Sequence, residues 1–125
     1  MPESPVRKVA ADALTPGHPT PGMRREAAFV LPDLWSGRAL TQPGSVSGWH
    51  HHGEHDSVLY VVAGAFTVET AIRTVHAGPG DFVHVPPHTI HRESNPSEQV
   101  AEVVLVRRGT GPVVVNVEDP APRSR

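Results

Sequence analysis

The sequence predicts an all-β protein, a single sandwich or barrel of short strands without long helices. The 125 residues include 14 prolines and 11 glycines, which interrupt helices and favour short strands joined by turns. The apolar residues fall in short runs that are rich in β-branched or aromatic side chains and show no helical period. The length suits one domain, and the absence of an internal repeat predicts one barrel and not a tandem pair.

The predicted elements lie between two polar ends. Residues 1–22 hold too few large apolar groups for a core and predict an extended N-terminal arm, and residues 119–125 predict a disordered tail. Residues 23–118 are expected to form the barrel, with strands at the apolar runs 27–31, 57–62, 65–69, 82–85, 100–106 and 113–115. Gly64, between two of these runs, is expected to turn a hairpin, and residues 77–81 give a second strong turn signal.

Composition argues against several classes of protein. The net charge of −2 provides no basic field for nucleic acid or anionic lipid. Without cysteine there are no disulfides, thiolate metal sites or cysteine nucleophiles, which fits a reducing cytosol. The N-terminus lacks the apolar segment of a signal peptide, and no stretch approaches the roughly 20 apolar residues of a membrane helix. We therefore expect a cytoplasmic protein that binds a small molecule and neither nucleic acid nor membrane.

Three consecutive histidines, His50, His51 and His52, are the strongest chemical signal. Alternate residues of a strand face the same side, so His50 and His52 should point one way and His51 the other. Two imidazoles about 6.5–7 Å apart along a strand can converge on one metal ion, and a third ligand must then come from another strand. The spacing therefore predicts half of a metal site.

Glycines flank this histidine cluster at fixed distances, with Gly44 before it and Gly64 after it. A second cluster follows the pattern Gly80-(x5)-Pro86-x-His88-(x2)-His91-(x3)-Asn95. Together the two patterns resemble the two signature motifs of the cupin superfamily, over roughly residues 23–118. The second pattern departs from the family only at His88, where cupins usually have glycine, and histidine tolerates the positive φ of such a turn better than most residues.

The resemblance implies a double-stranded β-helix (jelly-roll) barrel in which His50, His52 and His91 surround one divalent transition metal per chain. Imidazole ligands favour Fe, Mn, Ni, Co, Cu or Zn over Mg or Ca, which prefer oxygen ligands. Three such ligands leave coordination positions open for a substrate.

The fourth ligand is where the chain departs most from the family. Cupins usually place a glutamate shortly after the second histidine, and the two ways of counting lead here to Asp56 or to Ser57. Asp56 would reach the metal if the strand bulges, whereas a serine hydroxyl is a poor ligand. Glu54, His55 and water are further candidates.

Glu93 is a second candidate carboxylate, because it shares a strand face with His91. A buried carboxylate is costly unless it meets a cation, a metal or hydrogen-bond donors. Glu93 is therefore either a catalytic general base or a replacement fourth ligand, and the alternative is a salt bridge to Arg92 or Arg73. The nearby pair of residues 107–108, both arginine, is interpreted as a solvated strand end.

The leading functional hypothesis is a mononuclear metalloenzyme that acts on a small chelating organic substrate, with dioxygenase-like chemistry favoured because a redox iron site needs open positions. Alternatives are a zinc-type isomerase, lyase or hydrolase, and a non-catalytic module that binds or senses a small molecule. A homodimer is also expected, because a small barrel leaves edge strands and apolar groups of residues 30–34 without cover.

Overall fold

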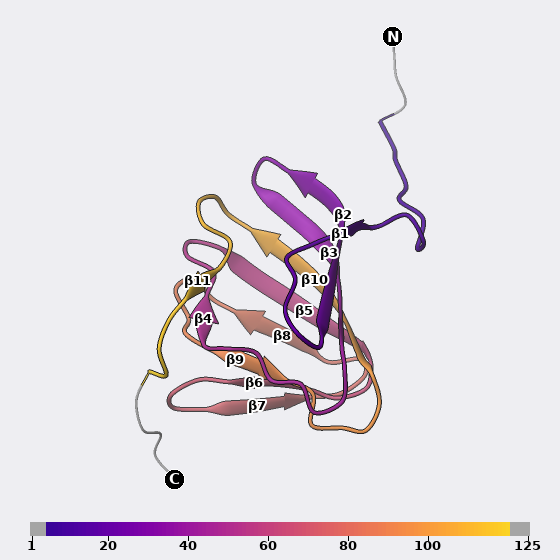
Figure 1. Cartoon of the computed structure of the whole chain (residues 1–125). Coiled ribbons are helices and arrows are strands. Elements are labelled where there is room, and N and C mark those ends of the chain that lie inside the picture. The colour runs from indigo at the N-terminus through magenta and orange to yellow at the C-terminus, as the bar shows by residue number, and fades with distance from the viewer. Residues whose placement is uncertain (1–4, 121–125) are drawn as a thin grey trace.

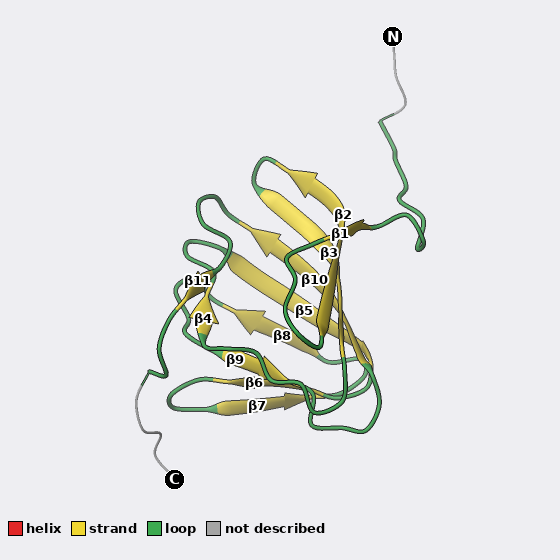
Figure 2. Ribbon diagram, in the orientation of Figure 1, coloured by secondary structure: helices red, strands yellow, loops and turns green. Residues whose placement is uncertain are grey.

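The computed structural model describes residues 5–120, which form strands, turns and loops and no helix (Figure 1, Figure 2). Residues 1–4 of the predicted arm and residues 121–125 of the predicted tail lie outside the described residues. Nothing in the described part of the chain is a helix of the length and apolarity that crossing a membrane requires.

The strands of residues 5–120, in chain order, are β1 (Thr15–Pro16), β2 (Met23–Leu31), β3 (Leu34–Thr41), β4 (His50–His51), β5 (Asp56–Ala63), β6 (Phe66–Glu69), β7 (Thr74–Ala77), β8 (Phe82–Val85), β9 (Arg92–Ser94), β10 (Ala101–Arg108) and β11 (Val115–Asn116). They form a six-stranded sheet, in the order β1-β2-β3-β10-β5-β8, and two smaller sheets, β7-β6-β9 and β11-β4. All the strand pairs are antiparallel. An isolated bridge between His50 and His91 connects the two smaller sheets, which thereby form a second layer opposite the large one (Figure 1).

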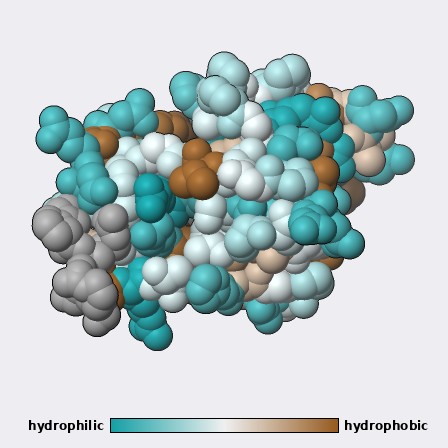
Figure 3. Space-filling model, turned by 60° about the horizontal axis from the view of Figure 1, so that its bottom comes forward, coloured by the Kyte–Doolittle hydropathy of each residue, from teal (hydrophilic) through white to brown (hydrophobic). Residues whose placement is uncertain are grey.

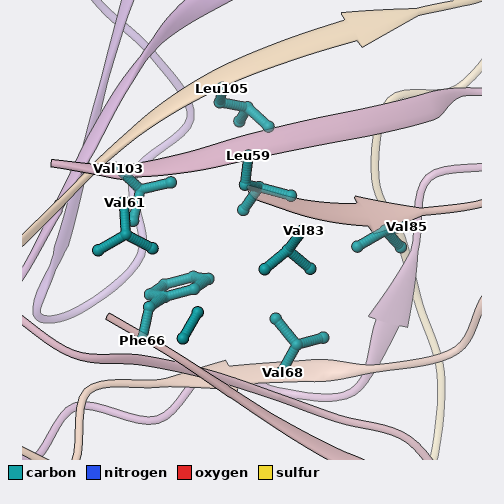
Figure 4. Packing of buried hydrophobic residues seen from close by; sticks show 9 residues of the cluster. Leu59, Val61, Phe66, Val68, Val83, Val85, Val103 and Leu105 are labelled. Carbon is teal, nitrogen blue, oxygen red and sulfur yellow. The ribbon is translucent and has the colours of Figure 1, made fainter. Parts of the chain in front are cut away.

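The apolar core fills the space between the two layers (Figure 4). Inward residues alternate along the strands, as a sheet with one buried face requires. The core comprises Leu59, Val61, Phe66, Val68, Ala77, Val83, Val85, Val103 and Leu105. In Figure 4 the phenyl ring of Phe66 lies below Val61 and Val103 of the large sheet, and Phe66 is 3% exposed.

Two expectations for the strands are corrected by the structure. The apolar runs missed β3 and β7, because residues 36–38 interrupt the large apolar residues of β3, and Val75 is the one large apolar residue of β7. Gly64 does turn the chain with a φ of 78°, but it does not close a hairpin. The strand before it pairs with β8 and β10 in the large sheet, while the strand after it pairs with β7 and β9.

The predicted arm contributes to the large sheet. Thr15 and Pro16 pair with β2 as the outermost strand, and the carbonyl oxygen of Ala11 accepts a hydrogen bond from Arg38, 3.0 Å away. The guanidinium of Arg7 lies 5.1 Å from the centre of the Phe29 ring. This part of the arm therefore covers an edge of the sheet.

The outer face of the large sheet exposes apolar side chains across three neighbouring strands. Tyr60 lies opposite Phe82 and Val104, and Val58 lies opposite Val106. The Tyr60 and Phe82 rings are 4.7 Å apart, and Phe82 is 72% exposed. Elsewhere, on the face that Figure 3 shows, exposed apolar residues stand in separate small patches among polar ones.

Candidate metal centre

Of the three consecutive histidines at β4 and just after it, two point into the barrel and one points outward. His50 and His52 are buried, whereas His51 is half-buried and its ring lies near that of His88. The Nδ1 atom of His51 accepts a hydrogen bond from the backbone N–H of Gly53, at 2.9 Å. The alternation therefore turns the two rings on either side of His51 towards the interior.

His91 approaches them from the opposite segment, just before β9. Its backbone N–H donates to the carbonyl of His50 and its own carbonyl accepts from the N–H of His50, each at 2.9 Å. The side chain of His91 is fully buried, and its ring centre lies 4.4 Å from that of His50 and 5.2 Å from that of His52. The strand pairing thus brings the three imidazoles together.

Each of the three rings is oriented by a backbone carbonyl. The Nδ1 atoms of His50, His52 and His91 lie 2.9, 2.6 and 2.8 Å from the carbonyl oxygens of Gly48, Val113 and Thr89 respectively. A carbonyl oxygen only accepts, so each Nδ1 must carry the hydrogen. In the neutral ring the lone pair then belongs to Nε2, which is the arrangement that prepares a histidine to bind a metal.

Burial favours the neutral, metal-binding form of two of these rings. Desolvation is the main reason that the pKa of His52 falls to about 3, with a further lowering from the charge of Arg107. Desolvation also lowers the pKa of His50. At neutral pH both imidazoles therefore offer a lone pair instead of a proton.

Glu93 supplies a carboxylate to the same cluster. Its Oε2 lies 3.3 Å from Nε2 of His91, and its Oε1 lies 3.9 Å from the guanidinium of Arg25. Burial alone raises the pKa of Glu93, but the hydrogen bond to His91 and the nearby positive charges outweigh it and lower the pKa. Glu93 is therefore an anion in the interior, and its ion pair is with Arg25 of β2 and not with Arg92 or Arg73.

These four side chains satisfy the spacing that a metal ion requires. One ligand atom from each of His50, His52, His91 and Glu93 can be chosen so that all lie within 4.8 Å of one another. Ligand atoms at about 2.1 Å from one ion lie about 3.0–4.2 Å apart, so side-chain shifts would bring the four donor atoms to one ion. Three imidazoles and one carboxylate are also a donor set that transition metals accept.

The other candidate ligands have different partners. Asp56 accepts from Arg108, at 3.1 Å, and pairs with Nε2 of His84, at 2.8 Å, on the outer side of the sheet. The hydroxyl of Ser57 accepts a hydrogen bond from Nε of Arg107, at 3.0 Å. Neither the Asp56 carboxylate nor the Ser57 hydroxyl belongs to the four-residue cluster found among residues 5–120.

The two remaining candidates from the connecting loop also lie apart from the cluster. Glu54 is exposed and pairs with His88, at 3.3 Å. His55 is buried, and its Nδ1 donates to the carbonyl of His52, at 2.8 Å. His88 itself adopts a φ of 59°, as expected for a residue in the place of a turn glycine. The structure therefore brings Glu93 to the three histidines and leaves the loop residues outside.

Two hollows in and near the centre are lined by Arg107. An inner cavity of about 20 Å³ is lined by His52, Glu93, Arg25 and Arg107 together with apolar core residues. That is room for about one water-sized occupant. A mouth cleft of about 230 Å³ lies between the β2–β3 turn and residues 109–113, and it is also lined by Arg107.

Sequence reasoning missed the two arginines of this centre. The interpretation of Arg107 as part of a solvated strand end is wrong, because it is only 6% exposed. The signal was present in the alternation of β10, where Ala101, Val103 and Leu105 point inward and Arg107 continues the same face. No pattern in the sequence pointed to Arg25, which reaches Glu93 only through the packing of β2 against the second layer.

Comparison with known proteins agrees with this architecture. The family described as Cupin domain matches residues 37–107, more than half of the chain. Quercetin 2,3-dioxygenase of Bacillus subtilis (strain 168) is 38% identical over 42 residues, which make up 34% of this chain. The match spans only 12% of that enzyme's length.

Two solved structures share most of the fold. KdgF from Halomonas sp. has a TM-score of 0.71 and 27% identity, and the match covers 84% of this chain and 96% of that chain. An uncharacterized conserved protein with a double-stranded β-helix domain from Klebsiella pneumoniae has a TM-score of 0.72 and 19% identity, over 93% of this chain and 99% of that chain. The predicted all-β jelly roll is thereby confirmed, and the chain belongs to the cupin domain family.

Proposed function

We propose that this chain binds one divalent transition metal ion through Nε2 of His50, His52 and His91, with the carboxylate of Glu93 as the fourth ligand. The observation that supports this most directly is the orientation of the three rings. Each Nδ1 donates to a backbone carbonyl, so three Nε2 lone pairs and one carboxylate converge in a buried space. Because Nδ1 of His91 donates to a carbonyl, the carboxylate of Glu93 at 3.3 Å from Nε2 requires a cation at that atom, either a second proton on His91 or a metal ion bound by both groups.

The proposed activity is that of a metalloenzyme on a small chelating organic substrate, with dioxygenase-like chemistry favoured. A bound Fe, Mn, Ni, Co, Cu or Zn ion would supply Lewis acidity and open positions for a chelating ligand. Glu93 would accept a proton from such a ligand if the ligand replaced its carboxylate on the ion. The short match to quercetin 2,3-dioxygenase supports dioxygenase-like chemistry over the other activities of similar sites.

Elemental analysis of four single variants tests the metal site. His50→Ala, His52→Ala and His91→Ala should each lose most of the bound metal, since each removes one of three converging ligands. The matched control is His51→Ala, which changes the neighbouring residue on the other face of the same strand. An equal loss of metal from His51→Ala would refute the assignment.

The activity is tested by anaerobic purification, identification of the metal and a screen for oxygen uptake with small chelating acids, phenols and thiols. Iron together with substrate-triggered oxygen uptake would support the dioxygenase. Zinc without oxygen uptake would favour an isomerase, lyase or hydrolase. A retained ligand without turnover would instead identify a binding or sensing module.

A further inference from the structure

Arg107 is a buried cation on the inner face of β10. It follows Val103 and Leu105 on the same side of the strand, and like them it is almost fully covered, with 6% of its surface exposed. Burial lowers the pKa of Arg107 to about 10, so the guanidinium still holds its charge at neutral pH. A charge in the interior of a small barrel is costly unless an anion or hydrogen-bond acceptors compensate it.

Within residues 5–120 this compensation is incomplete. A guanidinium has five N–H donors, and that of Arg107 has one hydrogen bond, from Nε to the hydroxyl of Ser57. Its other contact is the ring of Trp35, with a distance of 5.8 Å to the ring centre. No carboxylate of the described residues lies within 4.0 Å of it, whereas Arg25 and Arg108 each have one. The outer nitrogens of Arg107 are therefore available to a ligand.

Arg107 lines two separate hollows. It lines the mouth cleft together with Trp35 and His55, and it lines the inner cavity together with His52 and Glu93. Arg107 is thus the residue that the cleft has in common with the cavity beside His52 and Glu93. The cleft is also lined by apolar side chains at the end of β2, including Val30 and Leu31, which suit the carbon skeleton of a small organic molecule.

We propose that Arg107 binds a carboxylate of the substrate and thereby orients its chelating end towards the metal centre. This assignment rests on the proposed function of the centre. The planar guanidinium matches a carboxylate in a bidentate arrangement. A single free guanidinium balances the one negative charge of a carboxylate, whereas a phosphate dianion would leave a charge uncompensated near Glu93. The substrate class is thus small carboxylic acids with a metal-chelating group.

The test compares chelators that differ only in the carboxylate. The probes are acetohydroxamate, which has no carboxylate, and the monohydroxamates of malonic and succinic acid, which place one at two different reaches. Binding to the cobalt-loaded protein is followed by its visible spectrum. At least one carboxylated probe should bind about tenfold more tightly or better, as expected for a charge-assisted hydrogen bond. Equal or weaker binding of both would overturn the proposal without any variant.

Variants then assign the preference to Arg107. Arg107→Met should remove the preference and leave acetohydroxamate binding within about threefold, while Arg107→Lys should retain part of it. The matched control is Arg108→Met, which removes the neighbouring, exposed guanidinium and should leave the preference unchanged. A preference that survives in Arg107→Met, or disappears in Arg108→Met, would refute the assignment.

The metal content of each protein distinguishes a failure of the metal centre from a failure of the role of Arg107. If the native protein takes up no cobalt, the proposed metal centre fails. If cobalt binds and acetohydroxamate binds, but carboxylated probes gain nothing, the metal centre stands and the role of Arg107 is wrong.

Discussion

Replacing Glu93 by glutamine tests the metal centre at its least expected ligand. Glu93→Gln keeps the shape of the side chain and removes the charge that lies 3.3 Å from Nε2 of His91. A neutral amide is a weaker donor to a divalent ion, and the substitution also removes the anion that faces Arg25. We expect the variant to fold and to bind metal far more weakly than the native protein.

The size of the effect follows from the geometry. A carboxylate at a ligand distance of about 2.1 Å from a divalent ion attracts it by about 16 kcal/mol at an effective dielectric constant of about 20. Desolvation of the carboxylate and relaxation of the site offset a large part of this attraction. We therefore expect a loss of about 3 kcal/mol in binding free energy, a rise of about two orders of magnitude in the metal Kd.

Competition with a coloured chelator measures the Kd of Zn²⁺ or Co²⁺ for the native protein, Glu93→Gln and the control Glu54→Gln. Glu54 is an exposed carboxylate of the loop between the histidines and β5, so its substitution should change the Kd by less than about threefold. A Kd for Glu93→Gln within threefold of the native value would refute its role as a ligand. A large effect of Glu54→Gln would return the fourth ligand to the loop.

Three further predictions concern acid stability, the turn at Gly64 and assembly. Burial holds the pKa of His52 in the folded protein near 3, below its ordinary 6.5, so the unfolded chain takes up a proton first as the pH falls. The free energy of unfolding of the metal-free protein, measured by urea titration, should therefore fall by about 2 kcal/mol between pH 7 and pH 5. A flat profile would contradict this. Gly64→Ala should lower the free energy of unfolding by about 1–3 kcal/mol in the same titration. The φ of Gly64 is 78°, and a Cβ there would lie 2.8 Å from backbone atoms of Val100 and Ala101. The control Gly78→Ala, where a Cβ would meet open space, should leave the stability unchanged. We also expect a homodimer that covers the exposed outer face around Tyr60 and Phe82, and light scattering that returned the monomer mass of 13.4 kDa would exclude it.

The histidine cluster could be placed from the sequence because its geometry is local or fixed by strand alternation. Period-two alternation turned His50 and His52 to one side, and the motif resemblance selected His91, which the structure brings to them. The carboxylate of Glu93 followed from the same alternation. Alternation does not predict which strands far apart in the sequence lie close together. The contact between Arg25 of β2 and Glu93 of β9 was therefore missed.

Arg107 shows a different kind of failure. Its position on the inner face of β10 followed from the same rule that located the core, but its charge was interpreted as a sign of exposure. Charged residues are buried rarely, and where they are, a functional reason is common. The strand pattern was the better guide at this position.

The reciprocal backbone hydrogen bonds between His50 and His91 allow the opening of the centre to be followed by hydrogen exchange. Each amide proton of this pair is held by the carbonyl of the other residue, so its exchange with solvent deuterium requires the two segments to separate. Hydrogen-exchange rates at these two amides therefore report the free energy of opening the centre itself. A ligand ion that joins both side chains would slow the exchange of both amides together, in proportion to its concentration over its Kd.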